Sequence, residues 1–295
     1  MSIGSVPIES AAAVNSAQAE LRSEFRRNLV HSKTFRVGAG ILGFWILAAI
    51  FGNLLVPHDP LAQNLVAINQ APSGSHWFGT DQLGRDMFAR VITGARDILI
   101  VAPLATLIGT VLGTALGLVM GYFRGAVDEV IGRVVEAFLA LPLVVTGILG
   151  VTALGQSNTT LIIVIGIVFA PLIARTVRAA VLLERELDYV SAARLRGETS
   201  RYIMFVEILP NVLAPIMVEF TVRLGYAVFT IITLSFLGFG IQPPSANWGL
   251  EISTNYGQVT AGYWWEVLFD ALAIATLVVG VNMIANSIES ALDSS

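Results

Sequence analysis

Long apolar runs alternate with short polar stretches along most of this chain. A helix needs about 20 apolar residues to cross about 30 Å of membrane hydrocarbon, so runs of this length predict transmembrane helices. We expect six of them, at residues 38–56, 98–123, 134–154, 161–181, 212–233 and 265–288. The pattern therefore predicts an all-α polytopic membrane protein with six transmembrane helices.

The third and fourth predicted helices lie in one long run without charged residues, 137–174. A single helix of that length would measure about 57 Å at 1.5 Å per residue, nearly twice the hydrocarbon core. The polar stretch 155–160 therefore favours two helices joined by a tight external turn. Pro142 and Pro171 are expected to kink them. Residues 122–133 are expected to form a short polar turn.

Composition supports the same class of protein. Of the 295 residues, 55% are hydrophobic and 13% are charged, whereas soluble domains carry roughly 25% charged residues. Mean hydropathy is +0.74. The absence of cysteine excludes disulfides and thiolate metal sites, and the three histidines are too scattered along the sequence to predict a metal site.

The sequence contains no recognisable catalytic machinery. A phosphate-binding P-loop needs a lysine after a glycine-rich stretch, and Lys33, the only lysine, follows no such stretch. We therefore expect the chain not to be an enzyme and to bind no cofactor of its own. Energy for any transport would have to come from another protein.

Basic residues are distributed unevenly between the two sides of the six-helix arrangement. Most precede the first helix or lie in the turns after the second and fourth helices, whereas Arg85, Arg90 and Arg96 lie on the other side. The positive-inside rule then places both termini in the cytoplasm. Residues 1–37 are expected to be a cytoplasmic tail, disordered over 1–20, and residues 38–295 the transmembrane domain.

The segment 184–211, between the fourth and fifth predicted helices, is the most charged part of the chain. It carries Arg185, Arg194, Arg196 and Arg201, and an insert of this kind must lie in water. Asp188 is expected to cap a short helix that runs to Arg196, with Gly197 ending it in the left-handed conformation. Helical spacing places four residues on one small face suited to docking against another protein: Tyr189, Ala192, Ala193 and Arg196.

Residues 79–96 form an external amphipathic segment. Leu83, Met87, Val91 and Ala95 recur at every fourth position, and Asp86 and Arg90 could pair on another face. The pattern predicts a helix lying along the membrane interface.

Two further features fall within predicted spans. Gly109, Gly113, Gly117 and Gly121 form a bare stripe, which favours close helix packing over a pore wall without side chains. Glu219 and Arg223 can pair along the fifth helix. They could form a polar patch in a translocation path or a structural pair near a subunit or membrane boundary.

Two motifs resemble a known family. Ser191-Ala192-Ala193, Gly197 and Leu209-Pro210 are similar in register to the EAA loop of permease subunits of binding-protein-dependent ABC importers, although Ser191 replaces the usual Glu. An ordinary loop between spans is the alternative, and the matching spacing argues against it. Six residues match the G-T-D-x-x-G-R-D signature of the dipeptide, oligopeptide and nickel subgroup, more as a cap and tight turn than as substrate ligands: Gly79, Thr80, Asp81, Gly84, Arg85 and Asp86.

The resemblance implies a type I ABC importer permease fold and a C-type permease in the bacterial cytoplasmic membrane. It implies that residues 184–210 form a cytoplasmic coupling loop, that ATP and Mg are bound by partner ATPase subunits, separate or fused, and that this chain binds neither. The other implied partners are a paralogous permease subunit and an extracytoplasmic binding protein, with membrane lipid around them and no nucleic acid. A peptide is the favoured substrate, with nickel or another small solute as the alternative. A stand-alone channel or membrane-embedded enzyme would need a selectivity ring or paired catalytic groups, which are not recognisable.

Overall fold

The computed structural model describes residues 27–293, so the expected disorder of residues 1–20 lies outside the described residues. Within that range the chain is helical, and its β-structure is confined to an isolated bridge between Thr80 and Asp86. Five helices are long and apolar enough to cross a membrane. They are α2 (Lys33–Leu55), α3 (Met87–Phe123), α6 (Asn158–Glu184), α10 (Leu213–Phe236) and α12 (Trp265–Asp293).

The sixth span is broken. Helix α4 (Gly125–Leu139) and helix α5 (Leu143–Leu154) pass the test for a span only together, and they meet at an angle of 92°. The break contains Pro142, which cannot continue a helix and here sets the extended backbone before α5. The expected polar turn at 122–133 is wrong, because only Arg124 lies between the two helices and α4 begins at Gly125.

Among the described residues, six short elements lie between the long helices. Between α6 and α10 lie α7 (Asp188–Leu195), α8 (Ser200–Tyr202), a π-helix (Ile203–Ile208) and α9 (Leu209–Asn211); between α10 and α12 lie α11 (Trp248–Asn255) and a 3₁₀-helix (Tyr256–Ala261). Helix α2 begins at Lys33, five residues before the expected start of the first span.

Helix α3 corrects the predicted interfacial helix at 79–96. The chain turns at 79–86 and then enters a 37-residue helix that runs through Pro103 without a break. Met87 and Ala95 are fully buried instead of lying along a membrane surface. Their stripe faces protein, because Trp248 of α11 packs over this part of α3 and its indole Nε1 donates to Val91 O at 2.9 Å.

The glycine stripe of α3 packs against α6. A Cβ added to Gly113 would lie 2.7 Å from Ala170 O and 2.7 Å from Ile173 Cβ, and one added to Gly117 would lie 2.7 Å from Val177 Cβ. Gly109 and Gly121 make the same kind of approach, to Gly166 and Val181. These close approaches are those expected of a packing stripe, since a side chain there would push α3 and α6 apart.

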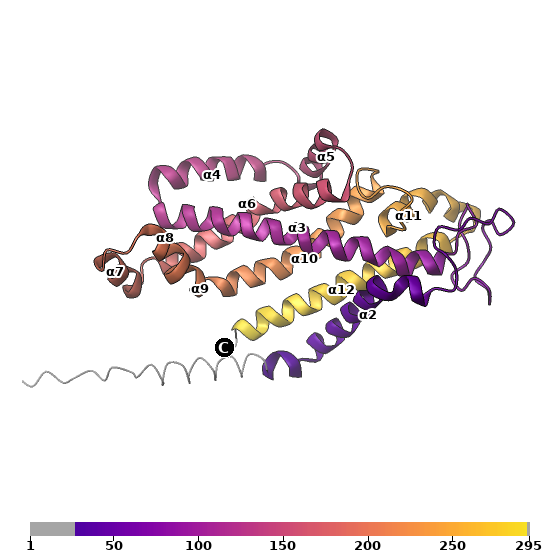
Figure 1. Cartoon of the computed structure of the whole chain (residues 1–295), viewed down its shortest axis with the longest axis horizontal. Helices are drawn as coiled ribbons and strands as arrows, with labels where there is room; N and C mark the ends of the chain where they lie inside the picture. Colours follow the sequence, from indigo (N-terminus) through magenta and orange to yellow (C-terminus); the bar gives the residue numbers. More distant parts are fainter. Residues whose placement is uncertain (1–26, 294–295) are drawn as a thin grey trace, which may run out of the picture.

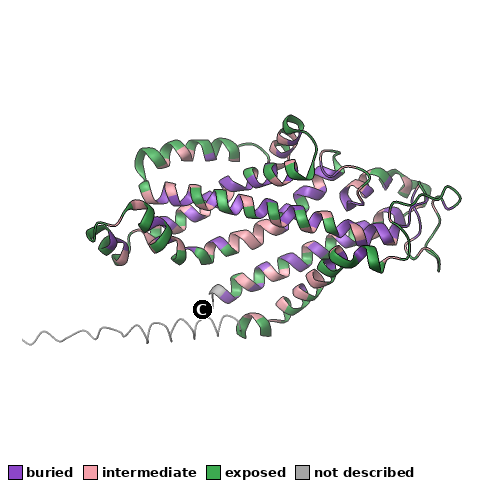
Figure 2. Ribbon diagram, in the orientation of Figure 1, coloured by how far each residue is buried: buried purple, intermediate pink, exposed green. Residues whose placement is uncertain are grey.

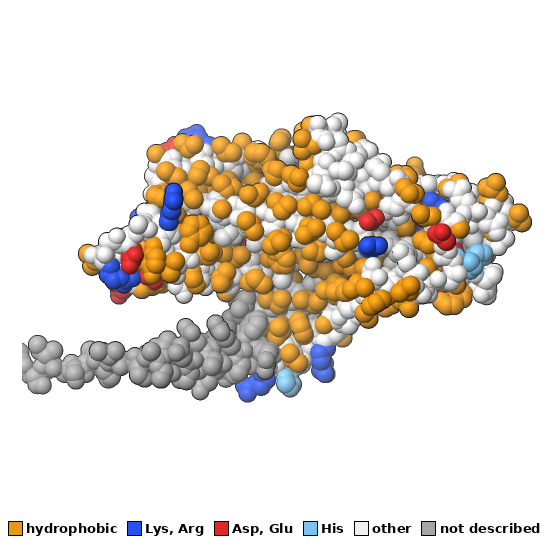
Figure 3. All heavy atoms as spheres, in the orientation of Figure 1, with side chains coloured by type: hydrophobic (Ala, Val, Ile, Leu, Met, Phe, Trp, Pro, Cys, Tyr) orange, Lys and Arg blue, Asp and Glu red, His pale blue; other side chains and the backbone are white. Residues whose placement is uncertain are grey.

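The molecule has two distinct ends (Figure 1). At one, the α7 end, lie α7, α8 and α9, together with the start of α2 and the close of α12. At the other, the α11 end, lie α11 and the loop of residues 56–86. Buried residues follow α3, α6 and α12, whereas α4 is mostly exposed (Figure 2). Hydrophobic side chains cover the middle of the face in Figure 3, as expected for a surface that meets lipid or another subunit.

Candidate functional site

Helix α7 is the centre of the loop between α6 and α10. Leu187 occupies the N-cap position and Asp188 is the first residue of the helix. No side chain caps this end, so the expected Asp188 cap is wrong by one position. A carboxylate in the first turn still interacts favourably with the helix dipole. Gly197 has φ of +79°, as expected. Gly197 N donates to Arg194 O at 3.0 Å and Glu198 N to Ala193 O at 3.2 Å, which is the Schellman arrangement.

The exposed face of α7 differs from the expected one. Val190 and Ala193 are fully buried and Tyr189 is half-buried, so the side carrying Tyr189 and Ala193 packs inward. Ser191 and Ala192 are exposed, and Leu195 retains 90% of its accessible surface. A leucine this exposed at the tip of a loop, beside two small residues, is typical of an unoccupied docking surface. We call Ser191, Ala192 and Leu195 the α7 tip.

Tyr189 ties α7 to the helices on both sides of the loop. Its hydroxyl donates to Glu184 Oε1 at 2.8 Å at the end of α6, and Asn211 Nδ2 of α9 donates to the same hydroxyl at 3.1 Å. Burial, with the hydrogen bond to Glu184, raises the pKa of Tyr189 to about 12. The phenol therefore stays neutral and can donate throughout the physiological pH range.

Three arginines attach the loop to α3 and to the π-helix. Arg185 and Arg194 both lie over the ring of Tyr122 in α3, with guanidinium carbons 5.9 Å and 5.7 Å from its centroid. Arg185 also donates to the backbone O of Tyr122, and Arg196 pairs with Glu207 of the π-helix at 2.8 Å. Burial, together with the neighbouring positive charge of Arg194, lowers the pKa of Arg185. Helix α7 is thus joined to α3, α6, the π-helix and α9.

Leu209 and Pro210 lie in a separate turn before the fifth span. Pro210 falls in the first turn of α9, where its missing N–H costs little. The backbone breaks at Val212, with φ of −97° and ψ of 9°, and α10 starts at Leu213. The π-helix and the break at Val212 are two irregular points between α7 and α10. Helices commonly bend at irregularities of this kind.

At the α11 end, the residues of the second motif form the turn and cap that lead into α3. Gly79 and Gly84 have φ of +76° and +69°. Asp81 Oδ1 accepts from Leu83 N at 2.9 Å and Arg85 N at 2.8 Å, while its Oδ2 accepts from Arg85 Nε at 2.6 Å. Thr80 is fully buried, and its carbonyl accepts from Trp265 Nε1 at 3.1 Å. These residues build the loop and face away from solvent.

The expected pair of Asp86 with Arg90 does not form. Asp86 caps α3, with Oδ1 accepting from Ala89 N at 2.8 Å. Arg90 is fully buried and donates to Glu251 of α11, to Pro60 O at 2.8 Å and to Ser245 O at 3.1 Å. The partners are far away in sequence, so helical spacing could not identify them.

Glu219 and Arg223 do pair, at 2.9 Å between Oε2 and Nε. Thr176 of α6 donates to the other carboxylate oxygen of Glu219 at 2.8 Å, and the Arg223 guanidinium lies 5.5 Å from the Tyr226 centroid. The pair therefore links α10 to α6 and is largely covered, a position that fits a structural pair as well as the wall of a path.

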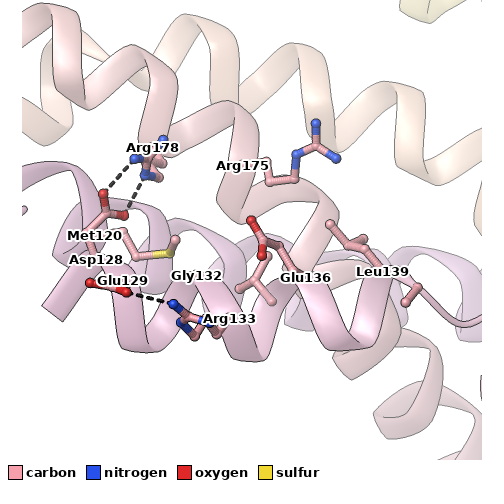
Figure 4. A pocket seen from close by; sticks show the side chains of 11 residues that line it. Met120, Asp128, Glu129, Gly132, Arg133, Glu136, Leu139, Arg175 and Arg178 are labelled. Atoms are coloured by element: carbon pink, nitrogen blue, oxygen red, sulfur yellow. Dashed lines mark hydrogen bonds and ion pairs between the residues drawn. The ribbon is translucent and has the colours of Figure 1, made fainter. Parts of the chain in front are cut away.

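A polar cavity of about 770 Å³ lies between α4 and α6 (Figure 4). Arg178 reaches across it to Asp128 at 2.6 Å, and Arg133 pairs with Glu129 at 2.8 Å. Arg175 and Glu136 also face the cavity, and neither side chain makes an ion pair within the described residues. The sequence did not predict this cavity, because the first half of α4 was expected to be part of a polar turn.

The structure also brings together three residues that the sequence keeps apart. Among the described residues, His58, His76 and Asp86 form the single group of three or more potential metal ligands, with ligand atoms within 4.8 Å of one another. His58 and His76 are distant in the sequence but close in space, because the loop of residues 56–86 folds back on itself.

Comparison with known proteins identifies the family. Residues 113–295 match the model described as the binding-protein-dependent transport system inner membrane component. Residues 21–72 match the N-terminal transmembrane domain of oligopeptide transport permease C.

Relatives match over nearly the whole chain. A dipeptide transport system permease protein of Bacillus subtilis (strain 168) is 35% identical over 267 residues, covering 90% of this chain and 83% of the relative. A glutathione transport system permease protein of Salmonella typhimurium is 37% identical over 274 residues, covering 92% and 89%.

A solved structure supports the fold. The inward-facing MetNI methionine ABC transporter contains a chain with a TM-score of 0.51 and 20% identity, covering 68% of this chain and 97% of that one. The expected ABC importer permease fold is confirmed. The chain belongs to the family of inner membrane components of binding-protein-dependent transport systems, and it is a multi-pass permease subunit of the bacterial cytoplasmic membrane.

Proposed function

We propose that this chain is one of two permease subunits of an ATP-driven importer and that the substrate is a peptide. The assignment of a peptide substrate rests on the similarity, over about nine-tenths of the chain, to dipeptide and other peptide permeases. A paralogous permease would form the other half of the path, and an extracytoplasmic binding protein would deliver the substrate.

We infer that the α7 end faces the cytoplasm. Basic residues concentrate in the segments found there, including Arg124, Arg185, Arg194 and Arg196. The positive-inside rule then puts the α7 tip within reach of an ATPase subunit, and the loop of residues 56–86 on the outer face. The residues assigned to coupling remain those of the EAA-like loop, with Ser191, Ala192 and Leu195 now as the contact face.

ATP and Mg would be bound by separate or fused ATPase subunits and not by this chain. Closure of the ATPase pair would move α7, and the attachments of Tyr189, Arg194 and Arg196 would carry that movement to α6, α3 and the π-helix. Such coupling requires an element with two positions that both sites bias. The π-helix and the break at Val212 are the points at which α10 could rotate relative to α7.

The Glu219–Arg223 pair and the α4–α6 cavity are two polar features that would suit a translocation path. Charged groups at membrane depth usually face a bundle interior or an aqueous cavity. Nickel or another small solute is the alternative substrate on the same scaffold. A channel or membrane-embedded enzyme has no support from the family match.

Uptake by a strain lacking this subunit tests the proposal. We expect loss of labelled di- and oligopeptide uptake with nickel uptake intact, and recovery when the gene is restored. Loss of nickel uptake alone would replace the peptide assignment. Co-purification of the chain without any ATP-hydrolysing subunit would contradict the importer assignment itself.

A further inference from the structure

His58, His76 and Asp86 converge on one carboxylate oxygen at the α11 end. His76 Nδ1 lies 2.7 Å from Asp86 Oδ2, and His58 Nδ1 lies 3.4 Å from the same oxygen. The two imidazole rings are 4.8 Å apart, centroid to centroid. Three ligand atoms therefore surround one small space, contributed by the turn after α2, by the middle of the loop and by the N-cap of α3.

We propose that these three side chains form a binding site for a divalent transition metal of the zinc type. Two imidazole nitrogens and one carboxylate oxygen are a common protein donor set for Zn²⁺, with a fourth position left for water. Ligands at about 2.0–2.1 Å from a tetrahedral ion lie about 3.3 Å from one another. The separation of His58 from Asp86 already matches that value, and the shorter His76 separation requires a small side-chain rotation.

The surroundings hold the ligands in place. The other oxygen of Asp86 accepts from Ala89 N, so the carboxylate cannot turn away without uncapping α3. His76 N donates to Ser73 Oγ at 3.2 Å, and His76 O accepts from Ser73 N at 2.8 Å and Gly79 N at 3.0 Å. The bond to the Asp86 carboxylate is of the kind that orients a metal ligand, whereas the backbone bonds of His76 fix the loop that carries its ring. Asp86 is 2% exposed in its side chain and His58 is 42% exposed, which leaves an entry path from solvent.

A metal here would clamp the loop of residues 56–86 to the first turn of α3. It would close a loop between positions 58 and 86, and a clip that closes a long loop limits the freedom of the unfolded chain. Because a metal that binds only the folded state adds its binding free energy to stability, the site would stabilise this end of the protein. Without metal, His76 hydrogen-bonds to Asp86 and His58 lies beside the same carboxylate oxygen.

The test uses Co²⁺ as a spectroscopic probe on the full-length chain in detergent, purified with a tag that contains no histidine. We expect one Co²⁺ per chain with the intense visible absorption of a tetrahedral site, displaced by Zn²⁺. Since the chain has no cysteine and three histidines, the background is low, and His31→Ala is the matched control because His31 lies before α2 and outside the cluster.

Three variants separate metal binding from folding. His58→Ala and His76→Ala should each abolish the absorption and the rise in thermal stability that Zn²⁺ gives to wild type. Asp86→Asn keeps an oxygen to cap α3 while removing the anionic ligand, so it should remain folded and bind Co²⁺ at least ten-fold more weakly. Binding unchanged in the histidine variants, or no Co²⁺ bound by wild type when metal is in large excess, would overturn the proposal.

Discussion

Arg90 is a charged side chain with almost no contact with solvent. Its guanidinium is held by Glu251 and by two backbone carbonyls, and Arg85 approaches the same carboxylate at 3.6 Å. Moving such charges out of water costs several kcal/mol per ion, which only close pairing offsets. These residues therefore join the loop of residues 56–86, α3 and α11 into one unit.

Replacing one partner of this pair should destabilise the protein strongly. We expect Glu251→Gln to lower the free energy of unfolding by about 3–5 kcal/mol, because it removes the carboxylate that pairs directly with the buried Arg90 guanidinium. Chemical denaturation in detergent measures the change. The exposed pair Arg133–Glu129 supplies the control, and Arg133→Gln should change stability by about 0.5 kcal/mol or less. Equal losses in the two variants would show that burial of Arg90 does not matter.

Substitution of Gly197 tests the role of the C-terminal end of α7, because a larger side chain there causes no steric clash. A Cβ at this position meets nothing within 4 Å, so the cost of a substitution is the left-handed conformation alone, about 1–2 kcal/mol for most residues. We expect Gly197→Val to reduce assembly with the ATPase or substrate uptake. Gly197→Asn should retain most of both, because Asn tolerates this conformation. Normal uptake with Gly197→Val would count against a role for the helix end in coupling.

At the scale of helices, sequence periodicity predicted correctly those features that depend on the residues of one helix. Glycines at every fourth position predicted the close approach of a neighbouring helix, which the structure shows to be α6, and charge-free lengths predicted the spans. Periodicity did not predict features that depend on how a second element packs against the helix. Whether Ala192 or Ala193 of α7 faces outward depends on the π-helix that packs against α7. Pro142 was expected to kink its helix, but the 92° angle of the break could not be foreseen.

The α3–α6 contact should not accept a side chain. We expect Gly113→Leu to prevent accumulation of folded protein, since the added atoms would lie inside Ala170 and Ile173. Gly43→Leu on α2 is the matched control, because a Cβ there meets nothing within 4 Å. Fluorescence-detected size-exclusion chromatography of both variants measures the folded fraction. A monodisperse Gly113→Leu protein at wild-type yield would contradict the packing described here.

For the whole molecule, the sequence was sufficient for the fold class and the family, because hydropathy and two short motifs are local in the chain. The network around Arg90 and the cluster of His58, His76 and Asp86 could not be predicted. Each depends on residues brought together by the tertiary fold, and no periodic pattern relates them. The α4–α6 cavity was missed for the same reason, since it needs both helices in place.

The central claim is that the α7 tip faces the cytoplasm and is held by an ATPase subunit. Because the chain has no cysteine, Leu195→Cys introduces a single reactive thiol. Val66→Cys provides a thiol of equal exposure at the other end, since Leu195 is 90% and Val66 91% exposed. Membrane-impermeant maleimide applied to intact cells and to inside-out vesicles, with and without the ATPase, then reports on both positions.

We predict that the thiol of Leu195→Cys reacts only in inside-out vesicles, loses that reactivity when the ATPase assembles, and forms a cross-link to it. The thiol of Val66→Cys should react only in intact cells, or in spheroplasts where an outer membrane is present. Labelling of Leu195→Cys from outside the cell, or reactivity unchanged by the ATPase, would contradict the account.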